Sequence, residues 1–504
     1  MNLTRLLYHI YFKQRVKAIA HYDDAEKIQK RVLRRLVKCA KDTEWGRTYG
    51  YGKVENYEDF AIQVPVNTYE ELKGYIQRMR EGEKDVLCKG KVCWFAKSSG
   101  TTNDKSKFIP VSKQGLQDTH YRGGKDCVAC YLRQNPKSRM FGGKSLILGG
   151  SFDKNECGQY SKAGDLSAIL IDHVPDVINL TRIPTKEIAL LSDFEQKREK
   201  IAQFARNKNV TNISGVPSWM LSVLHRMMEI NNTDTLDKIW PNLEVFFHGG
   251  VAFTPYREQY KKIIQHSDMH YLETYNASEG FFGVQTEQDD LAMTLMIDYG
   301  VFYEFIPMSE FDKSNPTVLP LWKVQTGVNY AMLISTSSGL WRYVIGDTIK
   351  FTKTVPYKFI ITGRTRHFIN AFGEELIIDN AEQGIREACE KTGAQVKDYT
   401  AAPIFMDNNA KCRHQWLVEF AVMPNDVNEF ADILDKKLQQ VNSDYEAKRY
   451  KDITLQHLEL IVARKGLFDD WLKSKGKLGG QHKVPRLSND RKHIEELMSL
   501  DMKN

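Results

Sequence analysis

Long hydrophobic runs are missing from this sequence, and their absence excludes one class of protein at the outset. No window reaches the ~18 uninterrupted apolar residues that a membrane-spanning helix needs. Between Met1 and Phe12 the apolar residues are interrupted by Arg5 and His9, so the core of a signal peptide is not expected either. We predict a cytoplasmic protein that does not insert into a membrane.

Cysteine is scarce and scattered, with eight residues in a chain of 504. A disulfide framework is typical of short secreted chains, so free thiols in a reducing compartment are expected. Cys127 and Cys130 are spaced like a metal or redox pair, but they lie inside a predicted helix and no second Cys or His pair follows at metal-binding spacing. We interpret them as two buried thiols on one helix face.

The sequence also has only a small excess of one charge sign over the other. The 71 basic and 64 acidic residues leave a net charge of +7, which requires no polyanionic partner. Arg31, Arg34, Arg35 and Lys38 share the outer face of a predicted helix and could contact a membrane or nucleic acid, but a solvated face is favoured. We expect no nucleic-acid partner, and a monomer or weak homo-oligomer; a basic binding protein without catalytic activity is the remote alternative.

The composition and length fit a soluble enzyme of more than one domain. Hydrophobic residues make up 42% and charged residues 27%, and 504 residues exceed one ordinary core. Helices and short strands alternate, which predicts an α/β fold with α+β elements. The expected helices begin at 3 and then cover 23–40, 112–133, 193–207, 379–391, 428–440 and 467–475, and the expected strands cover 92–96, 108–111, 146–149, 168–171, 243–247, 271–275, 331–335 and 416–422.

The texture of the sequence changes after Ile360–Arg364. We predict a large N-terminal domain over residues 1–363 and a small C-terminal α+β domain over residues 364–504. The hinge is placed near Gly363–Thr365.

The segment from Lys97 to Pro110 concentrates hydroxyl groups, a glycine and lysines between two predicted strands. Gly100 allows consecutive backbone amides to converge on an anion, and Lys107 adds a mobile positive charge. This pattern favours a phosphate cradle, although a solvent-exposed polar turn has a similar composition. It is not a Walker A loop, because that spacing is absent and a strand follows it. The cradle residues are Ser98, Ser99, Gly100, Thr101, Thr102 and Lys107.

Three later segments support the cradle. Gly249 and Gly250 follow an apolar strand and would let a flat ring such as adenine approach the backbone. Tyr275–Gly280 offers the carboxylate of Glu279 beside Tyr275 and Ser278, which suits Mg²⁺ held together with substrate phosphates. Asp347 follows a glycine and could accept both ribose hydroxyls.

In this order, the segments resemble the auxin-responsive acyl acid amido synthetases of the Gretchen Hagen family, within the adenylate-forming superfamily. Ser98–Thr102 is similar to the first signature of that family, Tyr275–Gly280 to the second, and Trp341–Asp347 to the third. Gln481–Arg486 resembles its late Gln-aromatic-Lys-x-Pro-Arg segment. The family's loop usually has a second glycine where this chain has Asp104, and its plant members have an Asp-Lys pair where this chain has Glu374–Glu375.

The resemblance implies that the large domain, residues 1–363, binds ATP and the acyl substrate, and that the small domain, residues 364–504, is mobile. It also implies a role for each matching residue. Ser98, Ser99, Thr101 and Thr102 would bind the phosphates of ATP, Glu279 would bind Mg²⁺ and Asp347 the ribose. Arg364 would sit at the hinge, and Lys483 would reach the α-phosphate and the acyl carboxylate. The expected activity is adenylation of a carboxylic acid followed by transfer to an amine, most simply an amino acid.

Two points stay open at this level. Transfer to coenzyme A, giving a thioester, would use the same adenylation residues, so amide formation is favoured over it only by the resemblance. The acid pocket is expected at the helix after Ser112 and the stretch from Ser214 to Met220, where Trp219 is a candidate wall. Arg122 and Lys125 are candidate partners of the substrate carboxylate.

Overall fold

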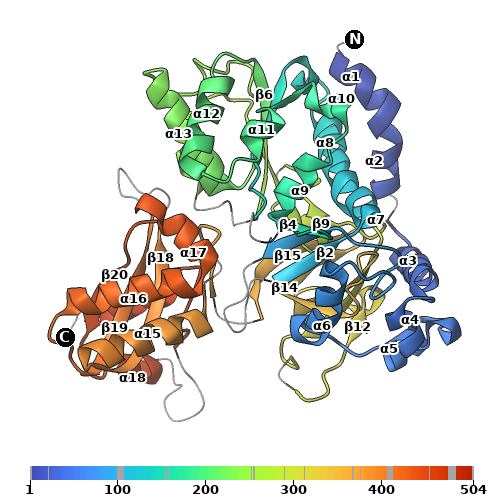
Figure 1. Ribbon diagram of the computed structural model, residues 1–504. Helices are drawn as coiled ribbons and strands as arrows, with labels where there is room; N and C mark the ends of the chain where they lie inside the picture. The colour runs from blue at the N-terminus through green and yellow to red at the C-terminus, as the bar shows by residue number, and fades with distance from the viewer. Residues whose placement is uncertain are drawn as a thin grey trace. The chain divides into compact units, whose positions relative to one another are not determined.

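The computed structural model describes residues 3–20, 22–98, 107–153, 156, 158–250, 253, 256–288, 290–311, 313–365, 368–374, 376–405, 412–452, 455–474 and 484–501. The chain forms two compact units (Figure 1). In the described residues, unit 1 covers the chain up to Thr365, and unit 2 covers residues from Phe368 onward. The domain boundary after residue 363 stays a prediction.

Unit 1 begins with helices, as the sequence predicts. The helix expected over 23–40 begins at Ala25, after its cap Asp24, whose side chain accepts a hydrogen bond from the backbone N–H of Lys27. The first group of helices is α1 (Leu3–Leu7), the π-helical turn η1 (Tyr8–Phe12), α2 (Lys13–Ala20), α3 (Ala25–Ala40), α4 (Glu44–Thr48), the 3-10 turn η2 (Tyr51–Lys53), α5 (Tyr57–Gln63) and α6 (Tyr69–Arg80).

A hairpin flanks the predicted phosphate cradle. Strand β1 (Trp94–Ser98) pairs antiparallel with β2 (Lys107–Val111) and parallel with β4 (Lys162–Gly164). The predicted order of strand, loop and strand is confirmed, with the first strand two residues later than expected. Ser112 caps the helical segment that follows by accepting from the N–H of Gly115. That segment comprises α7 (Lys113–Gly115), the π-helical η3 (Leu116–Tyr121) and α8 (Arg122–Gln134), in which Cys127 and Cys130 are buried and not disulfide-bonded.

Twelve strands in the described part of unit 1 form one sheet. Strands β5, β3, β6, β7 and β8 are parallel, and the strands beyond β8 are antiparallel. In spatial order the strands are β12 (Leu319–Pro320), β11 (Val301–Pro307), β13 (Asn329–Thr336), β14 (Tyr343–Thr354), β15 (Tyr357–Arg364), β10 (Met293–Leu295), β9 (Gly280–Val284), β8 (His270–Ala277), β7 (Val245–Gly249), β6 (Val210–Gly215), β3 (Lys144–Ile147) and β5 (Arg182–Ile183).

The remaining helices of unit 1 connect or cover these strands (Figure 1). They are the 3-10 turn η4 (Met140–Gly142), α9 (Leu166–Asp172), α10 (Asp176–Asn179), α11 (Lys186–Ala189), α12 (Phe194–Ala205), α13 (Pro217–Ile230), α14 (Arg257–Ile263) and the 3-10 turn η7 (Leu321–Lys323). The strand expected over 168–171 is wrong, because these residues lie in α9. A short apolar run fits a buried strand and a buried helix equally well.

Unit 2 is a smaller α+β body. Strand β19 (Arg413–Val422) pairs antiparallel with β18 (Gln395–Ile404) and parallel with β20 (Glu459–Ala463), and β16 (Phe368–Ile369) pairs with β17 (Leu376–Ile377). A β-carbon added at Gly384 would lie 2.6 Å from Leu434, which shows how closely α15 and α16 pack. The helices are α15 (Ile378–Thr392), α16 (Val427–Val441), α17 (Ser443–Arg449), the 3-10 turn η8 (Tyr450–Asp452), α18 (Leu467–Ser474) and α19 (Lys492–Asp501).

These elements confirm the predicted α/β class with α+β elements. Among the described residues, no helix is both long and apolar enough to cross a membrane.

Candidate active site

The carboxyl ends of parallel strands β3, β6, β7 and β8 meet at one edge of the large sheet. This edge is where ligands bind in parallel sheets, because the chain turns away there and leaves a crevice. Gly249 is the last residue of β7, and a β-carbon at this position would lie 2.4 Å from the carbonyl oxygen of Thr274 on β8. Gly250 has φ +86°, a backbone conformation that favours glycine. Close packing at Gly249 and the positive φ of Gly250 therefore explain why both positions are glycine. Their contact with adenine stays a prediction.

Glu279 lies in the turn between β8 and β9, beside Ser278. Burial raises the pKa of Glu279 to about 7, while the positive charges of Lys107 and Arg364 oppose this rise and the negative charge of Asp347 adds to it. These four side chains come from β2, the β8–β9 turn, β14 and β15, so one charged cluster draws on distant parts of the sequence. The carboxyl group of Glu279 would ionise readily once a cation or a further positive charge is bound nearby.

Asp347 is held by two neighbours in the same cluster. Its Oδ1 accepts a hydrogen bond from Nε of Arg364 at 2.8 Å, and its Oδ2 accepts a short hydrogen bond from the hydroxyl of Tyr275. The register of β13 and β14 shifts between Ala331 and Leu333, opposite the stretch that contains Gly346, whose φ is +98°. Such a bulge re-aims the neighbouring side chain. Each carboxylate oxygen keeps a lone pair for a ligand hydroxyl.

Two contacts that sequence reasoning missed support the cluster. Nδ1 of His120, on the π-helical segment η3, lies 2.8 Å from Oδ1 of Asn276 in the second signature. Burial lowers the pKa of His120 to about 4, so the ring is neutral and its Nδ1–H donates to the amide oxygen. The hydroxyl of Tyr69 accepts a hydrogen bond from the N–H of Phe108, directly after Lys107. No local pattern could reveal either pair, because the partners are far apart in the sequence.

The remaining predicted residues divide into described and undescribed positions. Ser98 ends β1 and pairs with Lys107 across the hairpin. Arg122 donates to Oδ2 of Asp298 at 2.6 Å, so binding a substrate carboxylate would require it to share or exchange this partner. Lys125 is exposed on α8, and Trp219 is partly buried on α13. Ser99, Gly100, Thr101, Thr102 and Lys483 lie outside the described residues, as do Asp104 and Glu375. The roles of all these residues stay predictions.

The cluster has the donor set that Mg²⁺ uses with a nucleotide. Magnesium is commonly bound by one or two carboxylates together with substrate phosphates and waters, and Glu279 supplies one carboxylate here. The hydroxyl of Tyr343 is buried, feels the charges of Glu279 and Arg364, and has no hydrogen-bond partner among the described residues. An orphaned buried hydroxyl needs a partner that a polar ligand atom would supply. The residues present therefore fit a magnesium-bound phosphate ligand.

Family models match most of the chain. The model of the GH3 family N-terminal domain matches residues 17–269, that of the GH3 family central domain residues 294–364, and that of the GH3 family C-terminal domain residues 379–492. The chain belongs to the GH3 family. The predicted family, which the sequence indicates through the order of its motifs, is thereby confirmed.

Curated GH3 relatives align over nearly their full length. Indole-3-acetic acid-amido synthetase GH3.3 of Arabidopsis thaliana is 22% identical, covering 91% of this chain and 89% of the relative. The 4-substituted benzoates-glutamate ligase GH3.12 of Arabidopsis thaliana is 22% identical over 96% of both chains. Jasmonoyl--L-amino acid synthetase GH3.5 of Oryza sativa subsp. japonica is 24% identical, covering 92% and 93%.

Solved structures show the fold of this GH3 chain. AtGH3.15 acyl acid amido synthetase in complex with 2,4-DB has a TM-score of 0.62 at 18% identity, covering 96% of this chain and 95% of that one. The 2-hydroxyisobutyryl-CoA ligase has a TM-score of 0.55 at 12% identity, covering 98% and 94%. The predicted adenylate-forming fold is confirmed.

The predictions of an AMP-forming ligase and of adenylation followed by amide formation are also confirmed. The thioester alternative is not favoured, since the named GH3 relatives are amido synthetases or an amino-acid ligase. Because the fold is shared with a CoA ligase, the distinction comes from family membership and not from the fold.

Proposed function

We propose that this GH3 ligase joins a small carboxylic acid with an apolar body to an amino acid, using Mg²⁺ and ATP at the cluster of Lys107, Glu279, Asp347 and Arg364. The observation that supports it best is the convergence of these four charged groups at the signature segments of the sheet. The names of the relatives describe amide formation by indole-3-acetic acid, and ligation of 4-substituted benzoates to glutamate and of a jasmonoyl group to an L-amino acid. The same kinds of substrate are proposed here.

In the first half-reaction, a carboxylate oxygen of the acid attacks the α-phosphorus of ATP. The new O–P bond forms as the bond to the β-phosphate oxygen breaks, and pyrophosphate leaves with the bonding electrons. Negative charge grows on the oxygens around the α-phosphorus, so preorganised positive groups lower the barrier. Lys107 is placed on the strand that follows the cradle to supply one such charge, and the resemblance gives Lys483 a second.

The nucleotide is held by groups with separate tasks. Asp347 accepts ribose hydroxyls, and its hydrogen bonds from Tyr275 and Arg364 fix the direction of its oxygens. Ser98 and the hydroxyl-rich segment after it bind the phosphates. When Mg²⁺ is bound, it neutralises charge on the phosphates, and Glu279 holds it.

In the second half-reaction, the amine nitrogen attacks the acyl carbon of the mixed anhydride. A C–N bond forms, the bond from the acyl carbon to the phosphate oxygen breaks, AMP leaves, and the nitrogen releases its proton to solvent or to the leaving phosphate. No covalent enzyme intermediate is needed. We propose that unit 2 changes position about Arg364 between the two half-reactions, which would let one site serve two different nucleophiles.

The acid's apolar body is proposed to contact the helical segment after Ser112 and the start of α13. Met220 is fully buried and Trp219 is partly buried at the start of α13, and apolar side chains of this kind commonly line ligand pockets. The cytoplasmic location and the monomeric or weakly oligomeric state stay predictions.

A two-stage assay tests the proposal. Pyrophosphate exchange into ATP is measured with the full chain across a panel of carboxylic acids, with and without Mg²⁺. The best acid is then supplied with each amino acid or with coenzyme A, and the products are identified by mass. Acid-dependent exchange and an amide product are expected. Exchange that is absent with every acid, or a thioester as the only product, would contradict the proposal.

A further inference from the structure

The helical segment α1–η1–α2 has an unusual outer face. Residues 3–20 contain no Asp or Glu, but they contain Arg5, Lys13, Arg15 and Lys17. Four large apolar side chains on this segment are exposed, namely Leu3 at 56%, Leu6 at 41%, Ile10 at 60% and Tyr11 at 70%. Lys13 is exposed on the turn after them. Exposed apolar side chains that gather on one helix indicate an interaction surface rather than chance exposure.

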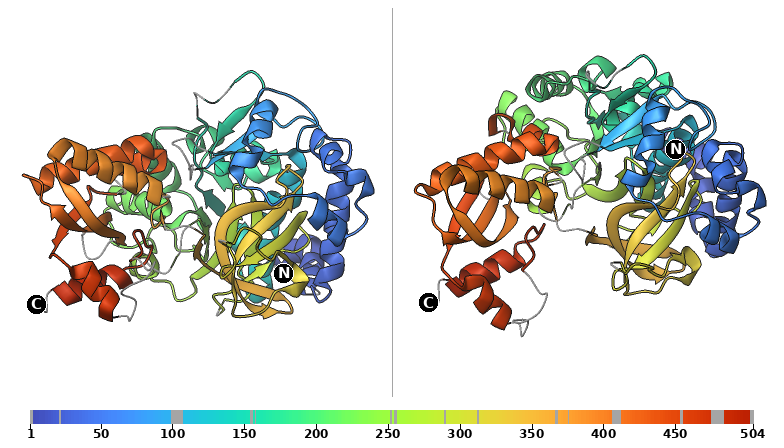
Figure 2. Two further views of the ribbon diagram at one scale, coloured as in Figure 1. Left: turned by 90° about the horizontal axis from the view of Figure 1, so that it is seen from below. Right: turned by 60° about the horizontal axis from the view of Figure 1, so that its bottom comes forward.

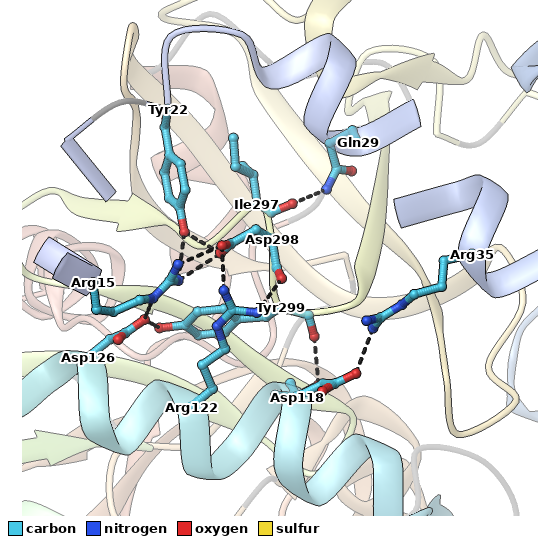
Figure 3. A network of polar contacts seen from close by, with 11 residues as sticks. Arg15, Tyr22, Gln29, Arg35, Asp118, Arg122, Asp126, Ile297, Asp298 and Tyr299 are labelled. Atoms are coloured by element: carbon cyan, nitrogen blue, oxygen red, sulfur yellow. Dashed lines mark hydrogen bonds and ion pairs between the residues drawn. The ribbon is translucent and has the colours of Figure 1, made fainter. Parts of the chain in front are cut away.

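The inner face of α2 is fixed to the body of unit 1 by a polar network (Figure 3). Nε of Arg15 donates to Asp126 at 2.7 Å, and its two terminal nitrogens donate to the carboxylate of Asp298 at 2.6 and 2.8 Å. Tyr22 donates to the same carboxylate, and Tyr299 donates to Asp126 at 2.6 Å. Because Arg15 is held between two carboxylates, the helix cannot turn its exposed apolar side inward without breaking the network.

Helix α3 is attached through Gln29 to the segment that contains Asp298. The side-chain amide of Gln29 donates to the carbonyl oxygens of Ile297 and Val301 at 2.7 and 3.0 Å. This contact faces inward, so the opposite side of α3 presents the exposed side chains of Arg31, Arg34 and Lys38. Figures 1 and 2 both show α1, α2 and α3 along one side of unit 1. An apolar strip and a basic strip are therefore held by adjacent residues of one loop.

A second basic segment lies against α1. The N–H of Phe141 donates to Oγ1 of Thr4 at 3.1 Å, and the Phe141 ring stacks on that of Phe12 with centroids 6.1 Å apart. Lys137 and Arg139, just before this contact, are exposed. Positive charge therefore flanks the apolar strip on this side as well.

We infer that this surface binds the surface of an anionic lipid bilayer. The surface, called the basic-apolar face below, consists of Leu3, Leu6, Ile10, Tyr11, Lys13, Arg31, Arg34 and Lys38. A helix with exposed Leu, Ile and aromatic side chains beside Lys and Arg lies in the headgroup region, its apolar residues among the upper acyl chains and its cations on lipid phosphates. The inference is independent of the proposed reaction.

Charge and chemistry favour a bilayer over two other occupants. A second copy of this chain packed through the same face would bring two basic surfaces together, since a twofold contact pairs a surface with itself. Nucleic acid would use the cations, but it offers no apolar layer for Leu3, Leu6 and Ile10. Anionic lipid satisfies both the apolar and the basic residues at once.

Vesicle co-sedimentation of the full chain tests the inference. The vesicles contain phosphatidylcholine alone or phosphatidylcholine with about 30% phosphatidylserine, at a salt concentration near physiological, where surface charge still acts over about 8 Å. We expect binding to the anionic vesicles and little to the neutral ones. One basic residue near an anionic bilayer changes the partition coefficient of a protein between water and the bilayer about fivefold. The double variant Lys13→Glu with Arg34→Glu should therefore bind the anionic vesicles more than tenfold more weakly. Leu6→Gln with Ile10→Gln should weaken it about tenfold.

Matched controls separate the face from general charge and hydrophobicity. Lys436→Glu with Lys465→Glu removes the same net charge from exposed positions of unit 2, and Leu291→Gln removes one exposed leucine elsewhere in unit 1. These variants should bind vesicles like the wild type. All variants should keep the circular dichroism spectrum and the thermal unfolding midpoint of the wild type, which shows that they fold.

Several results would overturn the inference. Equal sedimentation with neutral and anionic vesicles, or vesicle binding unchanged in both face variants, excludes the basic-apolar face as a lipid site. Light scattering that shows a wild-type dimer converted to monomer by Leu6→Gln with Ile10→Gln assigns the face to a second copy. Binding to a DNA or RNA oligonucleotide without vesicle binding assigns it to nucleic acid.

Discussion

Glu279 is the residue whose environment most clearly departs from that of an ordinary surface carboxylate. Burial raises its pKa, and the largest opposing effect is the positive charge of Lys107. When ionised, a carboxyl group of this kind lowers the stability of the folded protein, but a bound cation offsets this loss. The sequence also predicts this position as a magnesium ligand, from a carboxylate at a strand end and from the resemblance to the family.

Glu279→Gln should change both stability and metal dependence. The pKa of Glu279 rises from 4.5 to about 7 on folding, so the folded state binds a proton more readily and this group's contribution to stability is lost as pH rises through 7. The variant lacks this loss, so it should be more stable than the wild type above pH 7, by about 1–3 kcal/mol, with the advantage shrinking towards pH 5. Thermal unfolding across this pH range measures it.

The metal dependence of the same variant gives a second reading. Glu279→Gln should raise the Mg²⁺ concentration needed for half-maximal pyrophosphate exchange, because a neutral amide is a weaker ligand than a carboxylate. Glu273→Gln is the matched control, since burial also raises the pKa of Glu273, which lies on β8 just before the turn of Glu279. An unchanged Mg²⁺ requirement in Glu279→Gln would remove this residue as a metal ligand.

At the scale of elements, loops and strands near the site are fastened by buried charged side chains. Lys197 on α12 donates from Nζ to the carbonyl oxygens of Gly149 and Gly150 at 3.0 Å each, in the loop that follows β3. On the other side of this loop, Ser167 and Asp165 accept from the N–H groups of Gly150 and Ser151. The loop is therefore held from both sides at the edge of the sheet where the substrates are proposed to bind.

Lys197→Met should destabilise the protein and remove a pH dependence. Burial lowers the pKa of Lys197 from 10.5 to about 8, so the unfolded chain binds more protons between these values and wild-type stability rises with pH across this window. The variant leaves two carbonyl oxygens unpaired, which costs about 1–3 kcal/mol at pH 9. Denaturant unfolding from pH 7.5 to 10 measures both effects.

Lys200→Met, on the exposed side of the same helix, is the control and should keep the wild-type slope. A Lys197→Met protein with the wild-type rise in stability would mean that another group titrates in this window.

Arg342, inside the third signature, connects distant elements of unit 1. Its guanidinium donates to Glu304 on β11, with an Nε–Oε2 distance of 3.0 Å, and to the carbonyl oxygens of Ala61 and Val64 at the end of α5. Both side chains of the ion pair are almost fully buried. The hydroxyl of Tyr57 also donates to Glu304. Arg342 therefore joins α5 to the large sheet, directly before β14, the strand that carries Asp347.

Arg342→Met should therefore destabilise unit 1 strongly. The substitution leaves the carboxylate of Glu304 buried without its counter-charge. We expect this to lower the free energy of unfolding by about 3–5 kcal/mol. Arg342→Met with Glu304→Met should recover a large part of this loss, because both charges are gone. The free energy of unfolding in denaturant compares the three proteins, and a double variant no more stable than the single one would contradict the ion-pair account.

For the whole molecule, the division into two units raises the question of what the second unit contributes to adenylation. By resemblance, Lys483 supplies a positive charge to the α-phosphate and the acyl carboxylate, although it lies outside the described residues. Such a charge acts mainly in the transition state, where negative charge is greatest.

Lys483→Ala should lower the rate of pyrophosphate exchange by about two to three orders of magnitude and leave the Kd for ATP nearly unchanged. Lys473→Ala, an exposed lysine on α18, is the matched control and should exchange normally. Stopped-flow ATP binding and steady-state exchange separate the two effects. Normal exchange in Lys483→Ala would transfer the role to Lys475, Lys477 or Arg486.

Much of this protein could be read from its sequence. The fold class, the hairpin around the cradle, the helix capped by Ser112 and most other elements follow from hydrophobic spacing and capping residues, which act over a few neighbours. The adenylation chemistry followed from the order of four signature segments. Local signals erred where they are ambiguous, as in α9, whose apolar run fits a strand or a helix.

Only the tertiary structure decided which side chains meet. It placed Arg122 on Asp298, His120 on Asn276, and Arg342 between α5 and β11, pairs that are separated by at least tens of residues. It also set the raised pKa of Glu279, since burial and the approach of distant charges arise when the chain folds. Residue type and spacing determined what chemistry is available, and the long-range packing determined where it is placed.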